Sequence, residues 1–356
     1  MVSVIDVARL AGVSPATASR VLSGSSHAVS QTTRERVLAA AETLDFVPNA
    51  LARGLLKSRV PIVGVIVHDV TDPYFSEIVR GVEDAAENSG FLVITCSSDR
   101  VAEREESYVR LLRSMRAGVV IFAGSGIRDS ELEATVARHL SAMERYGAAV
   151  VNLSPSSRGV PFIGFDNVEG MAAAVGELVR MGHRRIGYLS GPSRLYVCVD
   201  RERGYRQALA AARIKTDANL VVATSFDGEG GAAGVDELLA RAPDVTALAC
   251  ANDLLALGAL DRLAELGVSV PGELSVTGFD DIPAAARTSP PLSTIRVPLR
   301  SLGAAGFRLA LKILDGRRPH RQVMPFEVMW RGSAAAPRAG ILDVATPLEA
   351  ALVAQA

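Results

Sequence analysis

The strongest constraint on the fold is an alternation that begins at Ile62, where short apolar runs are separated by amphipathic helical segments. Continuous apolar runs between helices indicate parallel strands covered on both faces. The runs are too many for one sheet of ordinary size, and the turn-rich stretch 154–161 divides them into two similar halves. We therefore predict an α/β core of two doubly wound parallel-sheet subdomains, with ligand sites at the carboxyl ends of the strands. The predicted strands are 62–67, 91–96, 118–124, 148–153, 185–191, 219–224, 246–251 and 274–281, and helices are expected at about 74–89 and 103–115.

The first sixty residues predict three short helices instead of strands. In residues 5–11, Ile5, Ala8 and Ala11 share one helical stripe, and Gly12 ends the segment. Ser14 caps a second helix over residues 15–22, and a third spans about 30–44. Two short helices with a tight glycine turn, braced by a third, form a helix-turn-helix unit. The side chains expected inside are Ala18, Val21, Leu22, Val37, Leu38, Ala41 and Leu44; those expected outside are Ala16, Thr17, Ser19 and Arg20.

Taken alone, this unit could equally be a small three-helix bundle whose exposed Ser, Thr and Arg side chains are merely solvated. The stretches IDVARLAGVSPATASRVLSG and TTRERVLAAAETLDFVPNALARGL, however, closely resemble the DNA-binding headpiece of the lac-repressor (LacI/GalR) family of bacterial transcription regulators. The resemblance implies a homodimer that binds a pseudo-palindromic double-stranded DNA operator, with the second helix in the major groove.

By this resemblance, Pro15, Ala16 and Arg20 occupy base-reading positions. Arg20 can donate two hydrogen bonds to guanine, worth roughly 1–3 kcal/mol of discrimination. Pro15 and Ala16 carry no side-chain donor, so they can read only shape or a thymine methyl group. The candidates for phosphate contacts are Ser14, Thr17, Ser19, Thr33 and Asn49.

The stretch NALARGLLKSR (49–59) predicts a very short helix capped by Asn49. About seven residues are far fewer than the roughly 12–15 that hold an isolated helix in water, so this one should form only with support. The resemblance implies a hinge helix in the DNA minor groove, with Leu55 as the wedge and Ala52 on the same face. Arg53, Lys57 and Arg59 are placed to meet phosphates. The alternative is a flexible basic linker.

The resemblance continues through DPYF (72–75), FDNVEG (165–170), GHRRIGYLSGP (182–192), RERGYR (201–206), ANDLLALGAL (251–260), VTGFDD (276–281) and SPPLSTI (289–295). It thus covers nearly the whole chain to about Gly332, and it implies a core of the periplasmic-binding-protein type. We expect an amino-terminal headpiece (1–48), a hinge helix and linker (49–59), a core that binds effector and dimerises (60–333), and a tail (334–356). Within the core, the expected subdomains are about 61–163 with 296–322, and about 165–294 with 323–333.

Strand ends should bring Asp72, Asn252 and Asp280 into one cleft, to which a loop adds Arg201. Aromatic walls would come from Tyr74, Phe75 and Phe226. Carboxylates, an amide and a guanidinium beside aromatic faces suit a hydroxyl-rich, sugar-like effector. The resemblance implies that Arg201, Asn252 and Asp280 contact the effector. The alternative for Asp280 and its neighbour Asp281 is a turn or a helix cap.

Two departures from the family pattern affect the choice of ligand. Many members end the fourth strand with an acidic residue, where this chain has Ser154, and the pocket-lining segment 195–199 is unusually apolar. These departures leave open a ligand less polar than a hexose.

Other classes of protein fit the sequence less well. The histidines are scattered, without metal spacing or a paired nucleophile, so we expect no enzyme, no metal and no cofactor. The opening MVSVIDVARL predicts no signal peptide, and the strand-length apolar runs predict no membrane span. Cys96 and Cys250 are expected to be buried thiols in a reducing cytoplasm. A constitutive architectural DNA-binding protein that ignores small molecules is the remaining rival, and the polar cleft residues argue against it.

Overall fold

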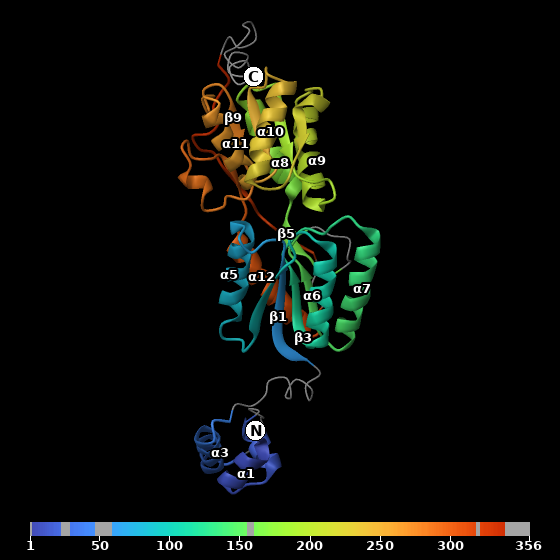
Figure 1. Ribbon diagram of the computed structural model, residues 1–356, viewed down its shortest axis with the longest axis vertical. Helices are drawn as coiled ribbons and strands as arrows, with labels where there is room; N and C mark the ends of the chain where they lie inside the picture. Colours follow the sequence, from blue (N-terminus) through green and yellow to red (C-terminus); the bar gives the residue numbers. More distant parts are fainter. Residues whose placement is uncertain (1, 23–28, 47–58, 155–159, 318–320, 339–356) are drawn as a thin grey trace.

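A computed structural model of the chain describes residues 2–22, 29–46, 59–154, 160–317 and 321–338. Those ranges hold a small helical headpiece and two α/β subdomains (Figure 1). Five of the predicted DNA-contact residues lie outside the described residues, as does the tail beyond residue 338. The five are Asn49, Ala52, Arg53, Leu55 and Lys57.

The headpiece consists of α1 (Val4–Ala11), α2 (Pro15–Leu22) and α3 (Gln31–Thr43), close to the predicted helices. Gly12 ends α1 in the left-handed conformation, with φ 63°, as a C-cap glycine does. Ser14 caps α2, because its Oγ accepts a hydrogen bond from the backbone N–H of Thr17 at 3.1 Å. Arg36 of α3 donates to the carbonyl of Gly12 at 3.1 Å, and so holds the third helix against the turn.

Two apolar side chains of the headpiece lie outside its core: Leu38, which was expected inside, and Ile5, which was expected to share a stripe with Ala8 and Ala11. Ile5 is 55% exposed and Leu38 is 50% exposed, whereas Val7 and Ala40 are buried. At about 100° per residue, Ile5 lies roughly 200° around the helix from Val7, so the two cannot share a face. The inward stripes are therefore rotated from the predicted ones, and Leu22 and Leu44 are only half-buried.

The amino-terminal subdomain is built on a parallel sheet in the order β2-β1-β3-β4. Its strands are β1 (Val60–Val67), β2 (Leu92–Ser97), β3 (Ala117–Phe122) and β4 (Ala149–Asn152). One face is covered by α5 (Pro73–Ala86) and α12 (Leu299–Leu314), and the other by α6 (Ala102–Ser114) and α7 (Ser130–Arg145) (Figure 1). The expectation that every strand is covered on both faces fails at the edge strand β2, where Leu92 is 62% exposed.

The carboxy-terminal subdomain repeats this arrangement with a parallel sheet in the order β7-β6-β8-β9. The strands are β6 (Ile186–Ser190), β7 (Val221–Ala223), β8 (Ala247–Cys250) and β9 (Ser275–Thr277). The packed helix pairs are α8 (Asn167–Arg180) with α9 (Tyr196–Ala211), and α10 (Gly228–Arg241) with α11 (Asp253–Glu265). Short 3-10 helices cover Ala218–Leu220 and Ala285–Arg287.

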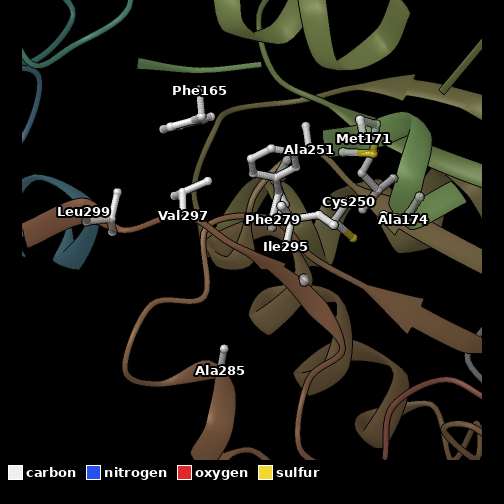
Figure 2. Packing of buried hydrophobic residues seen from close by; sticks show 14 of the residues in the cluster. Phe165, Met171, Ala174, Cys250, Ala251, Phe279, Ala285, Ile295, Val297 and Leu299 are labelled. Atoms are coloured by element: carbon white, nitrogen blue, oxygen red, sulfur yellow. The ribbon is translucent and has the colours of Figure 1, made fainter. Parts of the chain in front are cut away.

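Four three-residue strands, none of them predicted, lie where the chain passes between the subdomains. β5 (Ile163–Phe165) pairs in parallel with β11 (Gln322–Met324), and β10 (Thr294–Arg296) pairs antiparallel with β12 (Glu327–Met329). Figure 2 shows the apolar packing around this region, where Phe279 lies beside Ile295. Phe165 and Phe279 have ring centroids 6.1 Å apart. The crossover strands therefore stand on one continuous core that draws residues from both subdomains.

Candidate functional site

A cavity of about 400 Å³, including the part open to solvent, lies between the two subdomains. All eight side chains singled out from the sequence line it: Asp72, Tyr74, Phe75, Ser154, Arg201, Phe226, Asn252 and Asp280. The structure thus brings together residues that are up to 208 positions apart in the chain, as expected for strand ends that converge at one edge.

Two of the polar residues are also helix caps, which fixes how they face the cavity. Asp72 caps α5 through a 2.9 Å hydrogen bond that its Oδ1 accepts from the N–H of Tyr74. Asn252 caps α11, because its Oδ1 accepts from the N–H of Leu255 at 2.9 Å. Capping leaves one carboxylate oxygen of Asp72 and the amide NH₂ of Asn252 for a ligand.

Arg201 and Asp280 form a buried ion pair. The Nη2 of Arg201 lies 2.8 Å from Oδ1 of Asp280, and the two side chains are 2% and 7% exposed. Arg201 also donates from Nε to Asn167 Oδ1 at 2.9 Å and from Nη1 to the carbonyl of Ala251 at 2.6 Å. Its guanidinium carbon lies 3.7 Å from the centroid of the Phe279 ring. Arg201 therefore holds the pocket together as well as lining it.

The two aspartates after β9 have different partners. Asp280 points to Arg201, whereas the carboxylate of Asp281 lies 2.7 Å from both Arg296 and Arg331. The backbone of Asp280 has φ 115°, a strained value for a residue with a side chain, and such strain is concentrated at ligand clamps and switch regions. Both carboxylates thus form ion pairs, and Asp281 connects this loop to the crossover strands.

Burial is the largest influence on the pKa values of the charged side chains that line the pocket. It raises the pKa of Asp280 to about 6, because the lost hydration outweighs the opposing charge of Arg201. Burial also raises the pKa of Asp72. For Arg201, burial acts against the charged form, but the charge and hydrogen bond of Asp280 outweigh it and raise the pKa. The Arg201–Asp280 pair consequently brings no net charge to the cavity.

Aromatic side chains form the walls. The rings of Tyr74 and Phe75 meet edge to face with centroids 4.9 Å apart, and the Arg100 guanidinium lies 5.8 Å from the Phe226 ring. The Ser154 hydroxyl donates to the carbonyl of Ala123 at 2.9 Å and lies in hydrogen-bond contact with Tyr74. Such walls suit a ligand with apolar faces and polar edges.

Three lining residues were not predicted: His68, Arg100 and Ser125. Leu195 and Val197 also line the cavity, and they belong to the segment 195–199 that was expected to line the pocket. His68 directly follows β1, and Ser125 lies just beyond the end of β3. The rule that ligand sites lie at the carboxyl ends of strands would therefore have found both. Arg100 stands in a turn with φ 58°, and no sequence pattern marks it.

The outer face of α2 carries most of the predicted DNA-contact residues that the structure describes. Pro15, Ala16 and Arg20 are exposed, while Thr17 and Ser19 are partly exposed. Thr33, on α3, accepts a 2.8 Å hydrogen bond from the hydroxyl of Ser30, the cap of that helix. The base-reading candidates thus occupy one solvent-facing surface.

Two kinds of feature are missing from the part of the chain that the structure describes. Its His, Cys, Asp and Glu side chains form no group of three or more that could hold a metal ion. No helix within the same ranges combines the length and hydrophobicity needed to cross a bilayer. All three cysteines are buried free thiols, as predicted for Cys96 and Cys250.

Known proteins match both parts of the chain. Residues 3–49 match the bacterial regulatory proteins of the lacI family, and residues 175–334 match the periplasmic binding protein-like domain. The HTH-type transcriptional repressor PurR of Vibrio atlanticus is 32% identical over 323 residues, covering 91% of this chain and 95% of that protein. The HTH-type transcriptional regulator GalR of Escherichia coli is 36% identical over 318 residues, or 89% and 90% of the two chains. This chain belongs to the lacI family of bacterial regulatory proteins. It is a DNA-binding transcription regulator and not an enzyme.

Solved structures of lacI-family proteins have the same fold. A lac repressor dimer bound to operator and the anti-inducer ONPF matches with a TM-score of 0.81 at 27% identity, covering 94% of this chain and 99% of that one. A complex of the transcriptional regulator CelR with cellobiose matches with a TM-score of 0.68 at 32% identity, covering 94% and 100%. The predicted fold class, a helix-turn-helix headpiece followed by two parallel-sheet subdomains, is confirmed.

Proposed function

We propose that this lacI-family chain is a homodimeric repressor that works in the bacterial cytoplasm. It binds a pseudo-palindromic DNA operator, and a small polar effector in the inter-subdomain cavity sets its operator affinity. The observation that carries the effector role is the convergence of all eight predicted residues on one cavity. A constitutive DNA-binding protein would have no need for buried polar side chains gathered around a cleft.

On the DNA side, the proposal assigns base reading to Pro15, Ala16 and Arg20 on the outer face of α2. Phosphate contacts fall to Ser14, Thr17, Ser19 and Thr33 in the headpiece. The segment 49–59 is assigned to the hinge, with Leu55 as the minor-groove wedge. The domain limits given above, with headpiece 1–48 and core 60–333, belong to the same proposal.

On the effector side, the proposal favours a neutral, sugar-like ligand. The Arg201–Asp280 pair cancels its own charge, and the carboxylate of Asp72 and the amide of Asn252 are partners for hydroxyl groups. Relatives agree with this class: CelR was solved with cellobiose, and a regulator from Enterococcus faecium with bound ribose. The apolar side chains of Leu195 and Val197 favour a ligand with one less polar face.

A thermal-shift screen with cellobiose, ribose, other sugars, polyols and nucleosides tests the effector role. A true ligand stabilises the folded protein by mass action, by about 2.7 kcal/mol at a hundred times its Kd. Asp72→Asn should abolish the shift, and asparagine should still cap α5. Asp217→Asn is the matched control, because Asp217 also caps a helix through a 2.9 Å hydrogen bond, to Asn219 in the 3-10 helix Ala218–Leu220. If no compound raises the melting temperature, or if both variants lose the shift equally, the pocket is not an effector site.

A further inference from the structure

Besides the crossover strands, a second connection joins the two subdomains. It consists of residues 124–128, which follow β3 in the amino-terminal subdomain, and residues 194–197, which begin α9 in the carboxy-terminal subdomain. Ile127 and Leu195 form an antiparallel β-bridge, and the N–H of Arg128 donates to the carbonyl of Arg194 at 2.7 Å. This connection lies at the pocket, because Ser125, Leu195 and Val197 line the cavity.

The amino-terminal end of α9 is capped by the other subdomain. Its N-cap position is held by Leu195, which makes no side-chain cap hydrogen bond. The N–H groups at the start of a helix need partners that the helix itself cannot supply. Here Tyr196 donates its N–H to the carbonyl of Gly126 at 3.4 Å, and Val197 donates to the Oγ of Ser125 at 3.1 Å.

An apolar seam accompanies these hydrogen bonds. Ile127, Leu195 and Cys198 are 5%, 1% and 1% exposed, and all three belong to the core cluster on the α6–α7 side of the amino-terminal sheet. Two residues of the carboxy-terminal subdomain thus complete the core of its neighbour. This explains why segment 195–199 is more apolar than a pocket-lining loop requires.

We propose that residues 124–128, which belong to the amino-terminal subdomain, cap α9 of the carboxy-terminal subdomain. They act as a latch that holds the two subdomains together across the pocket. Opening the cleft then breaks the β-bridge, removes the cap of α9 and exposes the seam, all at once. The same helix carries Arg201, so the capped end of α9 and the pocket ion pair move as one unit. The inference stands on contacts between protein groups and does not depend on the identity of the effector.

Cys198 provides a built-in reporter of latch opening. Its burial raises the thiol pKa to about 12, and because the thiolate is the reactive form, alkylation of the closed protein should be slow. Cys250 is a second buried cysteine, at the end of β8 in the carboxy-terminal core, and serves as the internal control. The measurement is the rate of iodoacetamide alkylation at each cysteine in the purified full chain, followed by mass spectrometry of the peptides.

Ser125→Ala removes one cap acceptor and should raise the rate at Cys198 about fivefold, the population change that corresponds to a typical helix cap. Ile127→Asp, which places a charge in the seam, should raise it further. Ser98→Ala is the matched control, since the buried Ser98 hydroxyl donates to Val67 at 3.1 Å within the amino-terminal subdomain. A Cys198 rate that stays unchanged in both latch variants overturns the proposal. So does an equal rise at Cys250, because that would indicate general loss of stability. Neither result bears on effector binding, which the thermal-shift screen measures separately.

Discussion

Replacing Arg201 by alanine should damage the fold as well as effector binding. The change leaves the carboxylate of Asp280 buried without its counter-ion and removes the donors to Asn167 and Ala251. Breaking a buried ion pair by removing one partner costs about 3–5 kcal/mol. Urea unfolding monitored by circular dichroism should therefore give Arg201→Ala a clearly lower midpoint. A lost ligand response in this variant alone would say nothing about ligand contact.

A second variant separates the unpaired charge from the lost packing. Arg201→Met with Asp280→Asn removes both charges, so the double variant should be more stable than Arg201→Ala. Arg185→Ala is the control: it breaks ion pairs in which Arg185 is 33% exposed, and should cost no more than about 1 kcal/mol.

The pH dependence of Arg201→Ala gives an independent check. The folded-state pKa of Asp280 is already raised above the ordinary value of 3.8 in the wild type, and it should rise further without Arg201. The folded variant therefore binds a proton more readily than the unfolded chain, and its deficit against the wild type should shrink as the pH is lowered from 7.5 to 5.5. A wild-type urea midpoint for Arg201→Ala, or a deficit independent of pH, would refute this reasoning.

Three further predictions concern DNA binding and stability. Arg20→Ala should cost about 1–3 kcal/mol on the cognate operator and relax preference at one base pair per half-site; an equal loss on random DNA would identify Arg20 as a phosphate contact. Leu55→Ala should reduce the DNA bend measured by energy transfer without altering the salt dependence of binding. Lys57→Ala should instead lower the slope of log affinity against log salt by about one. An unchanged bend angle in the Leu55→Ala complex would exclude Leu55 as the wedge. Burial lowers the pKa of His183, so its contribution to stability is present above about pH 6.5 and is lost as the pH falls through the folded-state pKa. The difference in urea midpoint between the wild type and His183→Gln should narrow between pH 7.5 and 5.5, and a constant difference would contradict the assignment.

The cleft could be predicted from the sequence because parallel strands bring their carboxyl ends to one edge. Asp72, Asn252 and Asp280 each follow an apolar run at a short distance, so locating the strands also located the side chains. Two of these positions also stand directly before a helix, where Asp and Asn are common N-caps. What the residues bind did not follow, because the same strand ends serve many ligands.

The crossover strands could not be predicted, since each holds only three residues and pairs with a distant one. β10 and β12 are more than thirty positions apart, and β5 and β11 more than a hundred. No periodicity can develop over such a length. The exposed Leu92 has a different cause. An apolar run has the same sequence pattern on an edge strand as on a central strand. Only the order of strands in the sheet shows that β2 is at the edge, where Leu92 is exposed. The cap of α9 could not be predicted either, because the groups that accept its hydrogen bonds lie some seventy positions earlier in the chain.

In the proposed effector pocket, control of DNA binding must depend on groups that act from opposite subdomains. A ligand shifts a two-state equilibrium only by its difference in affinity for the two states. Most of the five N–H donors of Arg201 are already occupied by Asn167, Ala251 and Asp280, so Arg201 can add little to that difference. Among the other polar groups of the lining, the carboxylate of Asp72 belongs to the amino-terminal subdomain and the amide of Asn252 to the carboxy-terminal one. Two or three hydrogen bonds at about 0.5–1.5 kcal/mol each, and more where the Asp72 carboxylate accepts, supply the 1–3 kcal/mol of a typical allosteric coupling. A ligand that bridges Asp72 and Asn252 therefore needs no charge of its own to favour the closed cleft, and the latch supplies the contacts between protein groups that this closure must complete.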